Sequence, residues 1–444
     1  MASLPKETQP KDVMLGDVMN DLVMPLRLAP LEGTKDSLPA LSTTRYRVMA
    51  TLRALYDQWG YASVEVPAIE AFEPEHPAAY KAFKLVDGSD VMMLRADFTP
   101  SIARLIQAQE APHDRAAATF GRTGVYRYQY AGMLWQAINP DVARTREFTQ
   151  IGLELIGTSS YRADAELIHL ARESVRAVGL SPKVELGNPG LIRKLFALAE
   201  IPVTQQDTVA RTIDRKDVAG LARLLEPYAL APDLRDALLA TPDWYGGIEV
   251  LARAKRALPW AEVDVELEHL AALIDEFEDS SELRLDLGMA RRLDYYTGVT
   301  FRAYTSDSAQ PLLGGGRYDG ALLEHAAGFA LGLERIVSAL PHQAPQAPIA
   351  VSLDDPAARK LRAAGYKVVR ALMTTRDDIQ QEARSLGALF IIEGGVLEPV
   401  AYADAHADAQ PDDATETLGM KLQALIDGVI DITSSSQQKD HHHG

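Results

Sequence analysis

The chain has 444 residues, which is enough for two or three domains of ordinary size. It carries 45 lysines and arginines against 62 aspartates and glutamates, a formal net charge of −17. This excess of acidic residues excludes a protein whose whole surface binds nucleic acid, although it is compatible with a local basic groove. The absence of cysteine excludes disulfides, cysteine-ligated zinc, iron–sulfur clusters and thiol nucleophiles.

Residues 1–30 are expected to form an extension ahead of the first folded unit. Within it, Met14, Val18 and Leu22 permit a short amphipathic helix that Pro25 would end. The segment lacks the charged and then apolar order of a signal peptide. No run in the chain approaches the ~18 apolar residues of a membrane span. We therefore expect a cytoplasmic protein that does not contact membranes.

The next unit, residues 31–340, is predicted to open with a helix over 42–59, capped by the serine or threonine at its start. Further along, 125–136 and 144–156 both have the composition of strands, and a turn signal lies between them. This arrangement predicts a long antiparallel hairpin.

The second strand of this hairpin has two different faces. Strand periodicity puts Gln150, Gly152 and Glu154 on one side. The opposite side carries the apolar residues Ile151, Leu153 and Leu155. A glycine inside a strand often marks close approach by a ligand or by another backbone. The polar side is therefore either the floor of a site for a small polar ligand or an ordinary solvent-facing surface.

The second half of this unit alternates helical and extended patterns. Residues from about 190 to 278 are predicted to form a helical insertion broken by prolines. Strands are expected near Leu283 and over 295–304. Gly314–Gly316 is predicted to form a tight turn, and 322–340 a helix.

A proline-rich stretch, 341–348, predicts a second domain boundary. Residues 347–400 then follow a βαβαβ rhythm, which is typical of a small α/β domain with a parallel sheet. Residues 401–444 are expected to form an acidic, largely disordered tail, because 403–417 holds five acidic and no basic side chains. A short amphipathic helix is expected over Met420–Ile430.

The usual patterns of catalysis are missing from the sequence. Apart from the terminal histidine run, no two histidines have metal-ligand spacing on one helix, and no nucleophile-elbow motif occurs. Gly314–Gly316 is not followed by the Lys-Ser/Thr pair of a phosphate loop. We therefore expect no metal and no cofactor. The segment Gly288–Gly298, with two arginines and two tyrosines, is either a carboxylate clamp with a stacking wall or a basic loop beside core tyrosines.

Six motifs in the right order resemble the histidyl-tRNA synthetase family and its class II motifs 1, 2 and 3. They are Gly33-Thr34-Lys35-Asp36, the helix–strand unit that ends at Pro67, Arg144–Glu154, Arg291–Tyr296, Gly315–Asp319 and Gly328–Arg335. The resemblance covers about 31–340. It implies an α+β fold with a class II aminoacyl-tRNA synthetase-like antiparallel sheet flanked by helices. Residues 347–400 resemble a shortened anticodon domain of this family.

The resemblance also implies a histidine pocket. Its residues would be Asp97, Gln150, Glu154, Arg291, Tyr295, Tyr296 and Tyr318. Gln150 and Glu154 would contact the amino and imidazole groups, Arg291 the carboxylate side, and Tyr296 and Tyr318 the ring. Asp97 stands where the synthetases carry a glutamate that holds the amino group. The alternative to a ligand-binding role is that Asp97 is an acidic residue at a helix N-terminus, where the helix dipole stabilises it.

The ATP side of the resemblance is degenerate. The three positions where the synthetases carry Arg, Glu and Arg in motif 2 hold Gln136, Ile138 and Asn139. A neutral amide cannot supply the charge-assisted hydrogen bonds that clamp an α-phosphate during adenylation. A gap in the turn would bring Arg127 or Arg144 there instead. The motif 3 arginine, Arg335, is retained, and it faces either a site or solvent.

The family has two branches, and these departures favour one of them. One branch ligates histidine to tRNA; the other is the regulatory subunit of the short-form ATP phosphoribosyltransferase, which opens histidine biosynthesis. Residues 347–444 carry 15 acidic and nine basic side chains, which is unsuited to an anticodon stem. We therefore expect a subunit without catalysis of its own and without tRNA, needed for activity of the catalytic subunit and for feedback by histidine.

The resemblance further implies a homodimer core within a hetero-oligomer. The sequence leaves open whether histidine binds this pocket or another site of the complex. Two rival functions are an active histidine–tRNA ligase and a histidine-related amino-acid ligase that does not use tRNA, although both need the missing phosphate clamp.

Overall fold

The computed structural model of the chain describes residues 29–110, 124–140, 145–290, 295–306, 308–341, 347–401 and 413–428. The chain divides into two compact units, Met1–Gln343 and Ala344–Gly444. The helix expected near Met14 lies outside the described residues. Within the described ranges, no helix combines the length and apolar composition that crossing a membrane requires.

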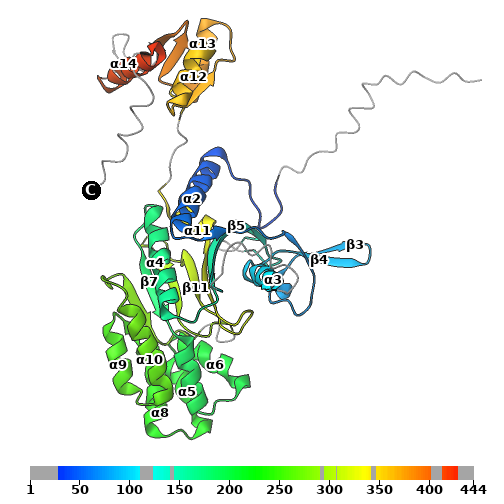
Figure 1. Cartoon of the computed structure of the whole chain (residues 1–444), viewed down its shortest axis with the longest axis vertical. Coiled ribbons are helices and arrows are strands. Elements are labelled where there is room, and N and C mark those ends of the chain that lie inside the picture. The colour runs from blue at the N-terminus through cyan, green and yellow to red at the C-terminus, as the bar shows by residue number, and fades with distance from the viewer. Residues whose placement is uncertain are drawn as a thin grey trace, which may run out of the picture. The chain divides into compact units, whose positions relative to one another are not determined.

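The first unit is built on a nine-stranded sheet (Figure 1) whose strand order is β1-β5-β6-β12-β11-β10-β7-β9-β8. The strands are β1 (Ala62–Ser63), β5 (Tyr126–Trp135), β6 (Glu147–Ile156), β7 (Lys183–Gly187), β8 (Tyr245–Gly246), β9 (Leu283–Asp286), β10 (Thr300–Tyr304), β11 (Leu313–Arg317) and β12 (Ala326–Gly332). β1 pairs parallel with β5, and β7 with β9; the other neighbours are antiparallel. A separate small sheet has the order β2-β4-β3, with β2 (Ile69–Ala71), β3 (Lys84–Asp87) and β4 (Asp90–Leu94).

Helices surround the large sheet. They are α2 (Pro39–Gln58), α3 (Thr99–Glu110), α4 (Tyr161–Ala177), α5 (Pro189–Leu198), α6 (Val203–Asp214), α7 (Val218–Leu225), α8 (Pro232–Ala240), α9 (Glu249–Ala257), α10 (Ala261–Ile274) and α11 (Leu333–Ala339). Single 3₁₀ turns are η1 (Ala79–Lys81), η2 (Glu226–Tyr228) and η3 (Thr241–Asp243). Together with the sheet, these elements form the expected class II synthetase-like α+β architecture.

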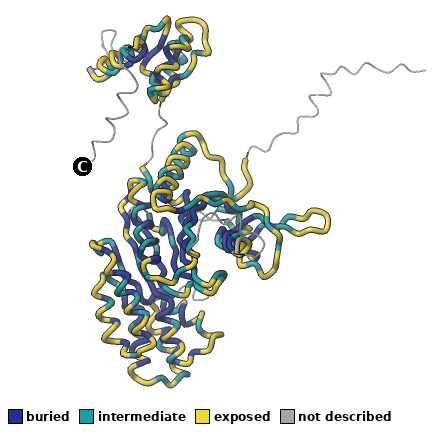
Figure 2. Tube along the Cα trace, viewed as in Figure 1, coloured by how far each residue is buried: buried dark blue, intermediate teal, exposed yellow. Residues whose placement is uncertain are grey.

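The predicted hairpin and its two faces are confirmed. β5 and β6 pair antiparallel over their full lengths. The apolar side of β6 is buried in the main core beneath α2, α4 and α11, with Ile151 and Leu153 fully inaccessible. The polar side of the same strand faces a second, smaller core, which is completed by Phe98, just before α3, and by Ile102 and Ile106 of α3. Figure 2 shows the buried backbone running through the strands between these layers.

Between β7 and β9, where the sequence predicts a helical insertion, the chain forms helices α5 to α10. Their inner faces are buried and their outer faces exposed (Figure 2), which is how amphipathic helices cover one another. The two-residue strand β8 interrupts the helices between α8 and α9, and the helical pattern of the sequence gave no sign of it.

The prediction of a tight turn at Gly314–Gly316 is wrong. These glycines form the middle of β11, which pairs with β10 on one side and β12 on the other. At Gly315 and Gly316 the neighbouring strands come too close for side chains. A Cβ on Gly315 would overlap the Gly328 carbonyl oxygen and the Phe329 Cβ atom.

The helix predicted over 322–340 is also wrong in its first half. Ala326–Gly332 is strand β12, and only Leu333–Ala339 is helical, as α11. The small residues of β12 fit close packing between strands. The same run of small residues is also compatible with a helix, which is why the sequence pattern was read as one. The first helix likewise begins earlier than predicted, at Pro39, because proline is favoured at the first helical position.

The second unit has the expected βαβαβ order. It comprises β13 (Ala350–Ser352), α12 (Asp355–Ala363), β14 (Val368–Arg370), α13 (Arg376–Leu386) and β15 (Phe390–Glu393), and the three strands are parallel. A fourth strand, β16 (Val396–Pro399), returns antiparallel on β15. The turn between them is Gly394-Gly395, and both glycines have positive φ values, which suits a two-residue hairpin.

The expectation of a largely disordered tail over 401–444 fails for part of that segment. Asp413–Asp427 forms helix α14, which starts inside the predicted linker. Its residues Leu422, Leu425 and Ile426 are buried in the core of the second unit against α12. These three residues lie within the amphipathic helix predicted over Met420–Ile430, but α14 begins earlier, among the acidic residues that the composition assigned to the linker.

The glycine pair in β11 gives a matched test of this packing. We expect Gly315→Ala to lower the free energy of unfolding by about 3 kcal/mol, because its methyl group would overpack the sheet. Gly314→Ala should change it by no more than about 1 kcal/mol, since the nearest atoms lie 3.7 Å from its Cβ position. Urea unfolding of both variants measures this difference, and equal stabilities would contradict it.

Candidate functional site

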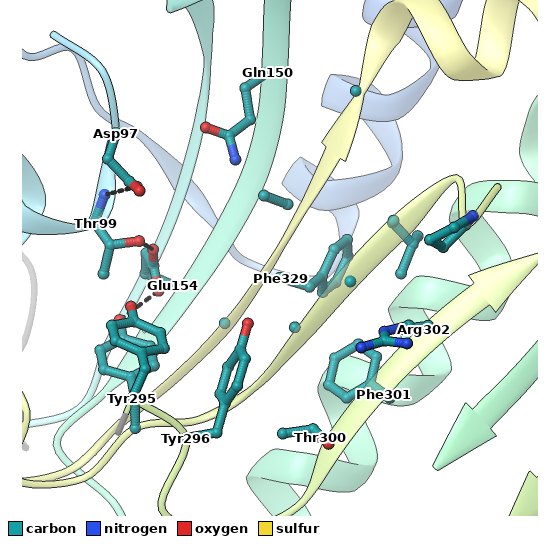
Figure 3. A pocket seen from close by; sticks show the side chains of 18 of the residues that line it. Asp97, Thr99, Gln150, Glu154, Tyr295, Tyr296, Thr300, Phe301, Arg302 and Phe329 are labelled. Carbon is teal, nitrogen blue, oxygen red and sulfur yellow. Dashed lines mark hydrogen bonds between the residues drawn. The ribbon is translucent and has the colours of Figure 1, made fainter. Parts of the chain in front are cut away.

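The polar side of β6 forms the floor of a pocket of about 1210 Å³ in the first unit. Strands β5, β10, β11 and β12 continue the floor, and η1, the start of α3 and the segment around Tyr295 rise at its sides. Of the predicted site residues, the pocket brings together Asp97, Gln150, Glu154, Tyr295, Tyr296, Tyr318 and Arg335. Figure 3 shows most of these side chains directed into the cavity.

Glu154 lies at the centre of this group and is 2% exposed. Its carboxyl accepts hydrogen bonds from the Tyr318 hydroxyl at 2.5 Å and from the Thr99 hydroxyl at 2.8 Å. Burial raises the pKa of Glu154 to about 8, although the two hydrogen bonds oppose this shift and nearby Asp97 adds to it. Glu154 therefore carries a proton through much of the neutral range and can donate or accept one at a ligand.

Two glycines make room for these polar groups. A Cβ on Gly328 would overlap the Glu154 carboxylate, and one on Gly152 would overlap the Tyr130 hydroxyl. Gly152 thus marks a close approach, as its place in the strand predicted, but the approaching atoms belong to Tyr130 and to the Phe329 backbone. The register of the hairpin explains this contact, because Tyr130 stands directly opposite Gly152.

Tyrosines form one wall of the pocket. Tyr295 stacks on Tyr318 with ring centroids 5.3 Å apart and 18° between the planes. Tyr296 meets Tyr295 edge to face at 5.0 Å. Burial raises the pKa of Tyr318 well above its usual range, so its hydroxyl stays a hydrogen-bond donor. The wall offers a flat aromatic surface beside a protonatable carboxyl, which suits a planar nitrogen heterocycle.

Two acceptors lie on the opposite side of Glu154. Asp97 accepts the Thr99 backbone N–H at 3.3 Å and an ion pair from Lys81 at 3.1 Å. Asp97 therefore lies just before α3, as the helix N-terminus alternative predicted, and it also lines the pocket. The Gln150 Oε1 atom is buried without a hydrogen-bond partner among the described residues. A buried acceptor of this kind is costly unless a ligand supplies the donor.

The other end of the pocket has a different character. Thr300, Phe301 and Arg302 of β10 line it together with Arg335 of α11 (Figure 3 shows the first three). The Arg335 guanidinium donates to the Pro311 carbonyl oxygen at 3.1 Å. Among the described lining residues, the acidic ones are Asp97 and Glu154, so this end is lined by cations without carboxylates. We call the two ends the acidic lobe and the arginine lobe.

The motif 2 positions contribute no cation to the arginine lobe. The Gln136 side chain donates to the Ala96 carbonyl oxygen at 3.1 Å and is not among the described lining residues. The Ile138 carbonyl oxygen accepts from Arg146, and Asn139 is exposed. Arg127, the alternative occupant, is paired with Glu166 at 2.7 Å instead. Arg144 lies outside the described residues.

Arg291, predicted to bind a carboxylate, lies outside the described residues, as does Arg292. The nearby Arg317 is buried and pairs with Asp164 at 2.8 Å and with Asp319 at 3.1 Å, so these residues brace the fold behind the pocket. The sequence interpretation missed the pocket residues Lys81, Thr99, Tyr130 and Arg302. The described residues hold no group of three His, Asp or Glu side chains placed to bind a metal.

Comparisons with known proteins agree with this geometry. Residues 33–336 match the family model described as histidyl-tRNA synthetase. The chain is 42% identical over 315 residues to a protein of Thermus thermophilus named ATP phosphoribosyltransferase regulatory subunit, covering 70% of this chain and 82% of that one. A protein of the same name from Deinococcus radiodurans is 36% identical and covers 84% and 90%.

Two solved structures are similar in fold. One is described as an ATP phosphoribosyltransferase regulatory subunit/histidyl-tRNA synthetase from Bacillus halodurans, with a TM-score of 0.68, 25% identity, and coverage of 81% of this chain and 97% of that one. The other is a histidyl-tRNA synthetase from Nostoc, with a TM-score of 0.70, 19% identity, and coverage of 82% and 91%.

The raised pKa of Glu154 predicts a pH dependence of stability. In the unfolded chain the carboxyl loses its proton near pH 4.5, whereas in the folded chain it keeps it up to about pH 8. The folded state binds more protons between these values, so the free energy of unfolding should fall as pH rises through this range. Glu154→Gln cannot ionise and should lack this component. Urea unfolding of both proteins at several pH values measures the difference, and parallel curves would contradict the prediction.

Proposed function

The chain belongs to the histidyl-tRNA synthetase family, in its branch of ATP phosphoribosyltransferase regulatory subunits, and from this premise we propose how it works. It binds the catalytic ATP phosphoribosyltransferase subunit in the cytoplasm, is needed for the activity of that subunit, and mediates inhibition by histidine. It performs no catalysis itself. One observation carries the proposal: six of the seven predicted histidine-pocket residues line one lobe, while no cation stands at the three motif 2 positions that serve adenylation.

The acidic lobe matches the groups of histidine one by one. The imidazole lies beside the tyrosine wall and shares a proton with Glu154, whose raised pKa permits either partner to hold it. The ammonium is held by Asp97 and by the buried Gln150 carbonyl oxygen. By resemblance, Arg291 binds the carboxylate. The lobe thus complements a zwitterion with a protonatable ring, and an aliphatic amino acid would offer Glu154 no ring nitrogen with which to exchange a proton.

Adenylation requires more than an amino-acid pocket. Negative charge develops at the α-phosphate during the reaction, and preorganised cations stabilise it. Removing one such donor typically lowers the rate by about 10²–10³-fold, and here all three motif 2 positions are neutral. Arg302 and Arg335 still line the arginine lobe, which is the specific observation in favour of the rival function, an active histidine–tRNA ligase.

Inhibition by histidine follows from linkage. Histidine must bind more tightly to the inhibited state of the hetero-complex than to the active state, and the ratio of the two affinities sets the size of the effect. A homodimer core would carry two such pockets. The second unit takes the place of the anticodon domain, and the net charge of −6 over residues 347–444 supports a complex without tRNA.

The partner assignment can be tested by co-purification with a short-form catalytic subunit. We expect a stable complex and phosphoribosyl transfer that depends on this chain. Histidine should inhibit the wild-type complex. Glu154→Gln should raise the half-inhibitory histidine concentration by about tenfold or more, because an amide cannot share a proton with the imidazole and the charge-assisted form of this hydrogen bond is lost. Glu173→Gln, on the exposed face of α4, should leave inhibition unchanged. Absence of both association and stimulation would contradict the proposal.

The rival function is tested by histidine-dependent exchange of pyrophosphate into ATP. We expect no exchange above background with the purified chain, because the phosphate clamp is absent. Gln136→Arg alone should not restore it, since the other two motif 2 positions stay neutral. Exchange at the rate of an intact synthetase would show that the chain is a ligase.

A further inference from the structure

Lys81 brings a second ammonium group to the acidic lobe. It is the last residue of η1, its side chain is 17% exposed, and it lines the pocket. Its Nζ atom lies 3.1 Å from the Asp97 Oδ2 atom. Asp97 is the carboxylate that the proposed function assigns to the ammonium of the ligand. The chain therefore already holds, at this acceptor, the same chemical group that the ligand would bring.

We propose that Lys81 is an internal competitor for the ammonium subsite. A ligand with an ammonium group binds by displacing the Lys81 side chain from Asp97, so Lys81 sets the affinity for such ligands. This inference rests on the proposed function, because it takes histidine as the ligand of the acidic lobe. It adds a specificity-determining residue that lies outside the motifs from which the pocket was predicted.

Both carboxylate oxygens of Asp97 are already engaged. Its Oδ1 atom accepts the Thr99 backbone N–H at 3.3 Å, and its Oδ2 atom accepts Lys81. The remaining lone pairs could accept a second ammonium group, but two ammonium groups at one carboxylate repel each other, and partial burial weakens the screening of this repulsion. Binding of the ligand therefore competes with retention of the Lys81 ion pair.

The backbone of Lys81 is fixed, so the exchange needs movement of a side chain alone. Its carbonyl oxygen accepts the Ala137 N–H at 2.7 Å. The residues around it are anchored in a small apolar cluster made of Ala78, Ala82, Met93 and Ala96. The flexible four-carbon stem of lysine can swing the ammonium away while this base stays in place.

Calorimetric titration of the full chain with two probes tests the inference. Histidine carries the ammonium, whereas imidazolepropionate has the same ring and carboxylate without it. Lys81→Met should bind histidine about three- to tenfold more tightly than the wild type, since no half-buried ion pair has to be broken. The affinity for imidazolepropionate should change less than about twofold. Lys81→Arg keeps the ion pair and should resemble the wild type.

Lys84→Met is the matched control. Lys84 lies on β3 next to η1, its Nζ atom is 4.1 Å from the centre of the Phe72 ring, and it is not among the described lining residues. This variant should bind both probes as the wild type does. If thermal unfolding shows that Lys81→Met does not fold, Lys81→Gln replaces it in the titration.

The outcomes separate the two claims. If the wild type binds histidine and the Lys81 variant binds it equally or more weakly, the competitor role is overturned while the histidine pocket stands. Weaker binding of imidazolepropionate by Lys81→Met would instead make Lys81 a clamp for the carboxylate, which also overturns the proposal. If neither protein binds histidine, the assignment of histidine to this lobe fails as well. Binding by the variant alone would support the competitor role.

Discussion

The burial of one carboxyl group, that of Glu154, organises the pocket. A carboxyl that is 2% exposed at the centre of a sheet needs hydrogen-bond donors and free space around it. Thr99 at the start of α3 and Tyr318 after β11 supply the donors, and Gly328 in β12 supplies the space. The Glu154 carboxyl group therefore contacts three elements that lie far apart in the sequence. The same burial raises the pKa of Glu154 to about 8, which converts a structural constraint into a chemical property.

The acidic lobe and the arginine lobe of the pocket differ in the groups that they offer to a ligand. The acidic lobe has two carboxyl groups, an aromatic wall and one unsatisfied acceptor, the Gln150 Oε1 atom, all of which fit a small zwitterion. The arginine lobe keeps Arg335, yet the turn after β5 has become a structural element: Gln136 binds the Ala96 carbonyl oxygen, and Ala137 binds that of Lys81. The turn is therefore tied to the residues on either side of the ammonium subsite. A pocket that binds without reacting is what a sensor requires, because occupancy can then report concentration.

Much of this could be predicted from sequence because strand periodicity is local. Alternation along β6 separated the core side from the pocket side, and the βαβαβ order of the second unit was readable from its composition. The glycines of β11 were misread as a turn, since their need for close strand packing depends on pairing with β10 and β12, and a run of glycines does not show that pairing. Lys81 and Tyr130 were missed for the same reason. The role of Tyr130 depends on its pairing partner in β6, and the role of Lys81 depends on the approach of η1 to the pocket. The spacing of residues along the chain shows neither.

The central claim is that histidine binds the acidic lobe of this chain within the hetero-complex. Equilibrium dialysis of labelled histidine against the reconstituted complex tests it most directly. The account predicts one saturable histidine site for each regulatory chain, with an affinity that falls about tenfold or more when Glu154 is replaced by glutamine in an otherwise intact complex. Sites whose affinity is unchanged in that variant complex, or whose number follows that of the catalytic chains, would contradict it.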